Sequence, residues 1–285
     1  MDKKKKTKTI VVMLVLLAFS IVGTVLTFHA EKHETVKEVM RDAVLHETNK
    51  ISLFGIMQID PSLLSGFIVT AFLLLAALII RIFVIPKFKF VPGKFQMLLE
   101  MWVGLFDGLA KSNSPHRNKA LGAYIFAIGS YIFVGTMFEL LGLQVVSTAG
   151  NSLALPAPLA NMNGAIAAGC FSYLFIVFGA VTANKLAGVG NALKEFSLPI
   201  SMTFRLFGAL LSGMLTTELV YYYMTLSFVL PVLVGVLFTV LHAVIQAYVL
   251  TMLTSFYYGE VTEIREKKKK KEATADETIE EAKAA

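Results

Sequence analysis

The feature that most constrains this chain is an arginine inside an apolar stretch. Residues 199–213 read Pro-Ile-Ser-Met-Thr-Phe-Arg-Leu-Phe-Gly-Ala-Leu-Leu-Ser-Gly, and their one charged side chain is Arg205. A guanidinium stays protonated at any accessible pH. Placing it at bilayer depth costs roughly 2.5–3.5 kcal/mol on insertion scales. We therefore expect Arg205 to face protein or water, with a partner for its charge.

Small residues surround this arginine on the predicted helix. Positions three, four and seven residues apart share a face; around Arg205 these are Ser201, Gly208, Ala209 and Ser212. Small side chains allow a neighbouring helix to approach closely. The pattern predicts a fixed positive charge on a face of low relief. The alternative interpretation is ordinary small-residue packing with an arginine that snorkels towards water.

The composition is that of a membrane protein. The chain has 285 residues, of which 56% are hydrophobic, and its mean hydropathy is +0.68. We predict an all-α polytopic membrane protein with five to six membrane spans. The net charge of +6 is concentrated in the tails and short loops, which indicates membrane topology rather than nucleic-acid binding. Cys170 is the one cysteine, so no disulfide forms within the chain.

The chain divides into four parts. Residues 1–30 combine a lysine-rich start with an apolar run, which predicts a signal peptide or a first membrane span; the length of the run favours a retained span. Residues 31–60 are polar and are expected outside the membrane. Residues 61–260 form the predicted membrane domain. Residues 261–285 form a charged tail on the cytoplasmic side.

Further spans and loops follow from hydropathy and charge. An amphipathic stretch at 95–109 predicts a helix in the membrane interface or a hairpin that dips into the membrane. We expect two long C-terminal helices, an uncharged outer loop and a basic inner loop. The five spans after the first are predicted at 63–84, 121–143, 164–182, 198–224 and 231–258, the outer loop at 144–163 and the inner loop at 185–195. Basic residues place both termini in the cytoplasm if the first span is kept.

Other polar side chains lie within the predicted spans. Thr239, His242 and Gln246 are three and four residues apart, so they share a helix face. Glu139 and Glu218 are candidate buried acids. At about 1.5 Å per residue, Glu218 lies roughly 20 Å along the helix from Arg205; it also points about 140° away. The two acids either line a separate outward cavity or sit in the outer headgroup region.

The sequence contains no recognisable motif of an enzyme active site. It has no phosphate-binding loop, no cluster with metal-ligand spacing and no Ser/His/Asp arrangement. We therefore predict neither a catalytic site nor a bound metal or cofactor. The chain is expected to move something rather than to make or break a bond.

The motif from Pro199 through Arg205-Leu-Phe-Gly resembles the signature of subunit a of the F-type ATP synthase, in its bacterial form. The resemblance covers nearly the whole chain after the N-terminal extension. The other similar segments are Gly93-Lys-Phe-Gln96 with Glu100, Glu139-Leu-Leu-Gly-Leu, Leu159-Ala-Asn-Met-Asn163, Ile245-Gln246-Ala-Tyr-Val and Met252-Leu-Thr. Their order, together with the arginine motif, makes the resemblance specific.

The resemblance implies a stator in the bacterial inner membrane, beside a rotating ring of c subunits and next to the stalk subunit b. Two aqueous half-channels would reach the ring from opposite sides. The family's essential arginine matches Arg205, and its glutamine on the last helix matches Gln246. The family usually has Asn at Ala209 and an acid or histidine at Met214 or Thr239. The nearby Glu139, Glu218 and His242 are expected to substitute in ion translocation.

Two other function classes remain open on the sequence. A secondary transporter or channel working alone would carry solute when reconstituted by itself, and such proteins usually show repeats or broken helices. A purely structural assembly subunit would give no reason to bury Arg205. The coupling ion is also open, with the proton as the default and sodium as the alternative.

Overall fold

The computed structural model describes residues 51–53, 57–146, 152–222 and 230–263. The predicted first span within residues 1–30, most of the 31–60 segment and nearly all of the 261–285 tail lie outside the described residues. Six α-helices make up most of the described part: α3 (Pro61–Ile79), α4 (Lys94–Asn113), α5 (Asn118–Phe138), α6 (Met162–Lys194), α7 (Ser197–Tyr222) and α8 (Leu230–Thr262).

Short irregular turns and hairpins connect these helices. A π-helical turn (Ile80–Val84) and a 3₁₀ turn (Ile85–Lys87) extend α3, and a 3₁₀ turn (Glu139–Leu141) ends α5. Two antiparallel hairpins pair β1 (Ile51–Leu53) with β2 (Met57–Ile59) and β3 (Gln144–Val146) with β4 (Ser152–Ala154). The 144–163 loop expected from the sequence thus contains a small hairpin that its composition did not lead us to predict.

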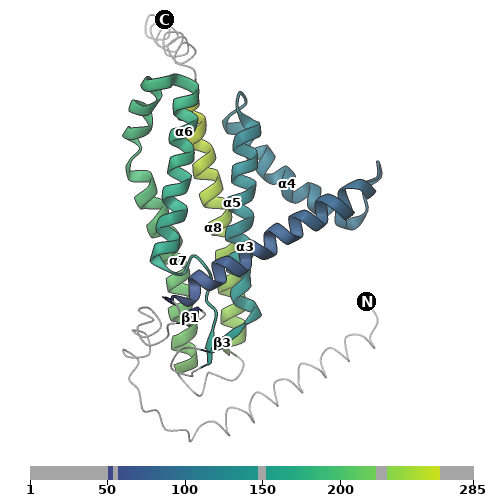
Figure 1. Cartoon of the computed structure of the whole chain (residues 1–285), viewed down its shortest axis with the longest axis vertical. Helices are drawn as coiled ribbons and strands as arrows, with labels where there is room; N and C mark the ends of the chain where they lie inside the picture. The colour runs from purple at the N-terminus through teal and green to yellow at the C-terminus, as the bar shows by residue number, and fades with distance from the viewer. Residues whose placement is uncertain (1–50, 54–56, 147–151, 223–229, 264–285) are drawn as a thin grey trace, which may run out of the picture.

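Helices α5 to α8 form a bundle, with α8 packed against α5, α6 and α7 (Figure 1). The C-terminal half of α4 contacts α5 and α8, whereas its N-terminal half, like α3, diverges from the bundle. Gly129 on α5 shows how tightly three helices meet. A Cβ there would clash with the Phe106 ring of α4 and lie 2.9 Å from Cγ2 of Thr251 on α8. A side chain at this position would therefore separate the three helices.

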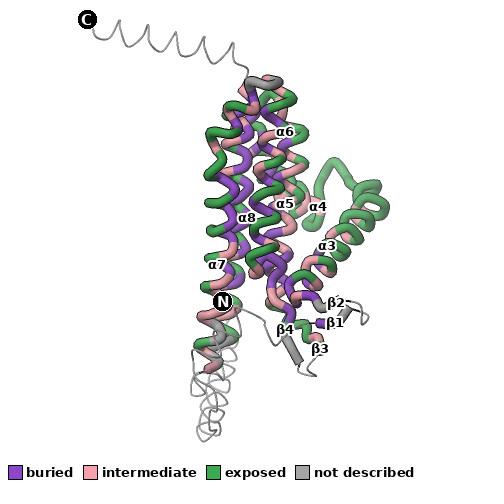
Figure 2. The backbone as a smooth tube through the Cα atoms, turned by 60° about the vertical axis from the view of Figure 1, so that its left-hand side comes forward, coloured by how far each residue is buried: buried purple, intermediate pink, exposed green. Residues whose placement is uncertain are grey.

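Lipid-facing character is clearest on the part of α3 after Val69, where no residue is buried (Figure 2). Large apolar side chains of α3, such as Phe67, Phe72 and Leu74, are 59–67% exposed, as expected of a helix surrounded by hydrocarbon. Four described helices are long and apolar enough to cross a membrane, and five if a pair bent by 45° counts as one. That pair joins the end of α6 to α7. The predicted all-α polytopic membrane fold is confirmed.

The predicted inner loop at 185–195 is wrong, because α6 continues as a helix to Lys194. Hydrogen bonds within α6 and to the end of α8 hold this region in place. The side-chain amide of Asn184 donates to the carbonyls of Val261 and Glu263, at 3.1 Å each. The Tyr173 hydroxyl donates at 3.1 Å to the carbonyl of Ala192, which lies 19 residues later in the same helix, so α6 folds back on itself. The chain therefore reverses direction between Asn184 and Gly188, and the last turns of α6 lead into α7 at an angle of 45°.

The helix predicted at 95–109 is present as α4, and it packs on the bundle along one side. Phe106 and Ala110 are fully buried, and the Trp102 indole N–H donates to Ser130 Oγ on α5 at 3.0 Å. Its opposite side is exposed, including Met101 at 69%. Packing on α5 and α8 explains the apolar residues in the second half of α4, whereas Phe95 and Leu98 stay exposed at 57% and 55%. The location of α4 in the membrane interface remains a prediction.

Candidate functional site: the arginine face of α7

The orientation of α7 about its axis is set by its contact with α6. Met202, Leu206 and Leu210 recur every four residues and are at most 4% exposed. Thr203 Oγ1 donates to the carbonyl of Pro199 at 2.7 Å. A Cβ at Gly169 of α6 would lie 2.7 Å from that same hydroxyl oxygen. The two helices approach closely here, so the opposite side of α7 faces outward.

The outward side carries the residues predicted from the sequence. Arg205, Ser201, Gly208 and Ser212 are exposed, and Ala209 is half-buried. A Cβ at Gly208 would meet nothing within 4 Å. We call these five residues the arginine face. The chain places a guanidinium on a surface of small side chains and leaves the space in front of that surface open.

Arg205 forms no ion pair or hydrogen bond with the residues that the structure describes. An unpaired guanidinium at bilayer depth is costly. Because α7 holds this side chain away from the bundle, its partner has to come from water or from another molecule. This agrees with the expectation from the sequence that Arg205 faces water or another protein.

The stripe on α8 lies next to α7. A Cβ at Gly213 would lie 3.0 Å from Nδ1 of His242, which places the end of the arginine face beside this imidazole. Thr239 and Gln246 are 9% and 5% exposed, so the stripe faces the interior. Because α7 and α8 are antiparallel neighbours, Gln246 is about level with Ala209. It is thus about one helical turn, roughly 6 Å, from the level of Arg205.

The two candidate acids lie near the other end of the bundle. Glu139 is half-buried in the 3₁₀ turn that ends α5. Glu218 lies in α7 one turn before its end, and its side chain is outside the described residues, as is that of Met214. A single continuous helix joins Arg205 to Glu218, so their predicted separation of roughly 20 Å stands. The structure does not bring either acid next to Arg205.

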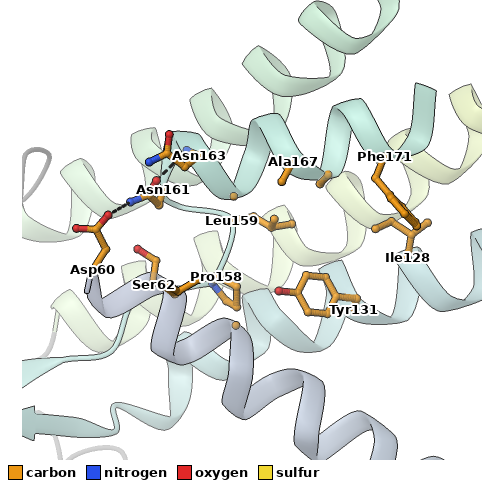
Figure 3. A pocket seen from close by; sticks show the side chains of 14 residues that line it. Asp60, Ser62, Ile128, Tyr131, Pro158, Leu159, Asn161, Asn163, Ala167 and Phe171 are labelled. Carbon is orange, nitrogen blue, oxygen red and sulfur yellow. Dashed lines mark hydrogen bonds between the residues drawn. The ribbon is translucent and has the colours of Figure 1, made fainter. Parts of the chain in front are cut away.

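A cavity of about 340 Å³ between α3, α5 and α6 was not anticipated from the sequence. Asp60, Ser62 and Asn161 lie at its mouth (Figure 3). One sequence signal was available: Asn161 directly precedes α6 and accepts from the backbone N–H of Asn163 at 2.8 Å, as an N-cap does. In the part of the chain that the structure describes, no three His, Cys, Asp or Glu residues gather as metal ligands.

Comparison with known proteins agrees with these features. A family model described as "ATP synthase A chain" matches residues 64–259. A similar protein from Histophilus somni (strain 129Pt), named "ATP synthase subunit a", is 26% identical over 59% of this chain and 76% of the relative. A protein of the same name from Cereibacter sphaeroides (strain ATCC 17025) is 25% identical over 66% of this chain and 78% of the relative. The matched region includes the whole arginine face.

Proposed function

Because the chain belongs to the ATP synthase A chain family, we propose that it is the stator subunit whose Arg205 faces the ion-binding carboxylate of each passing c subunit. The observation that carries this proposal is the arginine face. It presents an exposed guanidinium, unpaired among the described residues, on a low-relief helix surface. Membership of this family makes the chain an ion-transporting membrane component of the ATP synthase. The contact between Arg205 and the c-subunit ring is what we propose in addition.

The proposed mechanism follows from charge and solvation. Two unit charges 4 Å apart attract by about 4 kcal/mol at an effective dielectric constant of 20. Arg205 therefore favours the ionised form of a ring carboxylate and releases its ion. A loaded, neutral carboxylate tolerates lipid, whereas an empty, charged one does not. The arginine thus empties each site as it passes and blocks direct leakage between the two half-channels.

Small residues on the arginine face have a mechanical role in this proposal. Ser201, Gly208 and Ser212 are exposed, so the contact surface has little side-chain relief. A rotor has to move past the stator without interlocking side chains. Small residues permit close helix approach, and with it a short distance between Arg205 and the carboxylate.

Ion access is proposed to involve Gln246, His242, Glu139 and Glu218. His242 lies beside Gly213 of α7, and Gln246 is four residues further along α8, within about two turns of the level of Arg205. The acids lie near the end of the bundle that the basic loops predict to be outside. We expect Glu139→Gln or Glu218→Gln to slow ion flux through the assembled complex. Unchanged flux in both variants would assign the acids to the outer headgroup region.

The direct test is Arg205→Ala in inverted membrane vesicles that contain the assembled complex. We expect ATP-driven ion pumping to be lost, with increased passive leak. Arg81→Ala is the matched control, because Arg81 is an exposed arginine at the end of another candidate span. It should pump normally. Normal pumping by Arg205→Ala would refute the proposed mechanism.

The alternative functions make different predictions. A stand-alone transporter would carry ions when the chain is reconstituted without other subunits, and we expect none. A structural assembly subunit would tolerate Arg205→Ala whenever the complex still forms.

The membrane field supplies about 2.3 kcal/mol per charge per 100 mV to the proposed rotation. We propose the proton as the coupling ion and a bacterial inner-membrane location with both termini cytoplasmic.

The proposed partners are the c-subunit ring, the stalk subunit b and the lipid bilayer. The arginine face would contact the ring, and the exposed side of α3 is open to lipid or to subunit b. Sodium coupling would require ligands that sit mainly on the c subunit. Comparing pumping at constant pH with and without added sodium distinguishes the two ions.

A further inference from the structure

The cavity between α3, α5 and α6 has a polar end and an apolar end. Figure 3 shows Asp60, Ser62, Asn161 and Asn163 at one end and Ile128 and Phe171 at the other. Ten residues of α6 separate Asn161 from Phe171, which is about 15 Å of helix. That length is half of a hydrocarbon core about 30 Å thick, the thickness of one leaflet.

The polar mouth offers groups of opposite charge within a small space. Among the described residues that line the cavity, Asp60 alone is charged, and its Oδ2 accepts from the Asn161 amide at 3.1 Å. Beside it lies the N-terminus of α6, a helix of 33 residues. A helix N-terminus carries partial positive charge and exposed N–H groups, and so favours a phosphate. The mouth is therefore complementary to a zwitterion of amine and phosphate.

A buried hydroxyl supports a ligand at this mouth independently. Ser62 is 2% exposed and lines the cavity, and its Oγ has no hydrogen-bond partner among the described residues. Buried polar groups are nearly always paired. A ligand oxygen or an ordered water bound to that ligand would satisfy the Ser62 hydroxyl.

The deeper part of the cavity is apolar. Leu159, Ala167 and Phe171 line it, and Tyr131 contributes its ring (Figure 3). A water-filled ion path would need polar groups along its length, and the Tyr131 hydroxyl is the one polar side-chain group among the described residues that line this deeper part. A volume of about 340 Å³ falls at the lower end of the range for small-molecule sites. The shape and chemistry fit one acyl chain below a polar headgroup.

We propose that this cavity binds a phospholipid with a primary-amine headgroup. Its ammonium group would pair with Asp60, its phosphate would bind at the N-terminus of α6 with Ser62, and an acyl chain would extend past Ala167 to Phe171. A trimethylated headgroup has no N–H to donate, so a choline lipid would bind less well. This inference is independent of the role of Arg205.

The test uses the purified ATP synthase complex in phosphatidylcholine nanodiscs. A trace of phosphatidylethanolamine with a photoactivatable acyl chain is added, and labelled residues are mapped by peptide mass spectrometry. We expect label around Phe171 despite the excess of phosphatidylcholine, and we expect it to fall several-fold when about a tenth of the phosphatidylcholine is replaced by unlabelled phosphatidylethanolamine. Label that is absent at this site, or that this replacement leaves unchanged, would overturn the proposal.

Two variants and one control sharpen this test. Ala167→Phe fills the floor of the cavity and should remove most of the label. Ala71→Phe places the same ring on an exposed part of α3 outside the lining and should leave the label unchanged. Asp60→Asn can still accept the bond from Asn161 and should abolish the preference for ethanolamine over choline. Retained label in Ala167→Phe, or retained preference in Asp60→Asn, would contradict the assignment.

Discussion

The arginine face makes a prediction about Gly208 that separates folding from function. Nothing lies within 4 Å of a Cβ built at this position, so Gly208→Leu creates no clash inside the chain. Replacing glycine with a good helix former in a helix interior gains about 0.8–1 kcal/mol. The free energy of unfolding should therefore be unchanged or slightly raised, and the complex should assemble.

The expected functional cost comes from the distance to the ring. Interaxial distances between packed helices vary by about 2 Å with the side chains at the contact. If a leucine moves the ring carboxylate from 4 to 6 Å from Arg205, their attraction falls from about 4.2 to about 2.8 kcal/mol at a dielectric constant of 20. A difference of about 1.4 kcal/mol corresponds to a tenfold lower rate of coupled transport.

The assay is ATP-driven proton pumping into inverted vesicles, followed with a pH-sensitive dye and normalised to the amount of assembled complex. Gly104→Leu is the matched control, since Gly104 is an exposed helical glycine of α4 that also has open space around its Cβ. It should pump like the wild type. If Gly208→Leu pumps at the wild-type rate, the arginine face is not the surface that the ring passes.

Two further predictions concern packing. Gly169→Leu should destabilise the chain by about 1–3 kcal/mol, because even a Cβ there lies 2.7 Å from Thr203 Oγ1; thermal unfolding of the purified chain measures this, and an unchanged midpoint would contradict the α6–α7 contact. Trp102→Phe removes the hydrogen bond to Ser130 and should cost about 1 kcal/mol. Faster proteolysis of α4 would report its detachment, and a rate equal to that of the wild type would show that the bond is dispensable.

The sequence predicted the helices and the arginine face for a physical reason. Each span is a long apolar run, and hydropathy is sufficient to locate such runs. The spacing of Ser201, Gly208 and Ser212 around Arg205 requires only the helical period. The structure agrees on the shared face and adds that α6 covers the opposite side, which no periodicity could show.

Features that depend on distant contacts were not predictable. A loop was predicted at 185–195, yet the residues to Lys194 are helical and fold back so that the Tyr173 hydroxyl reaches the carbonyl of Ala192. The cavity forms where Asp60, before α3, meets Asn161, before α6. These residues are 101 positions apart in the sequence, so only the fold reveals their hydrogen bond.

The central claim is that the arginine face contacts the c-subunit ring. Disulfide cross-linking measures this contact most directly, with Gly208→Cys in a Cys170→Ser background, because Cys170 is free and exposed. A second cysteine is placed beside the ion-binding carboxylate of the c subunit. We predict an oxidant-dependent cross-link from Gly208→Cys and none from Ala77→Cys on α3. A cross-link from Ala77→Cys, with none from Gly208→Cys, would contradict the account.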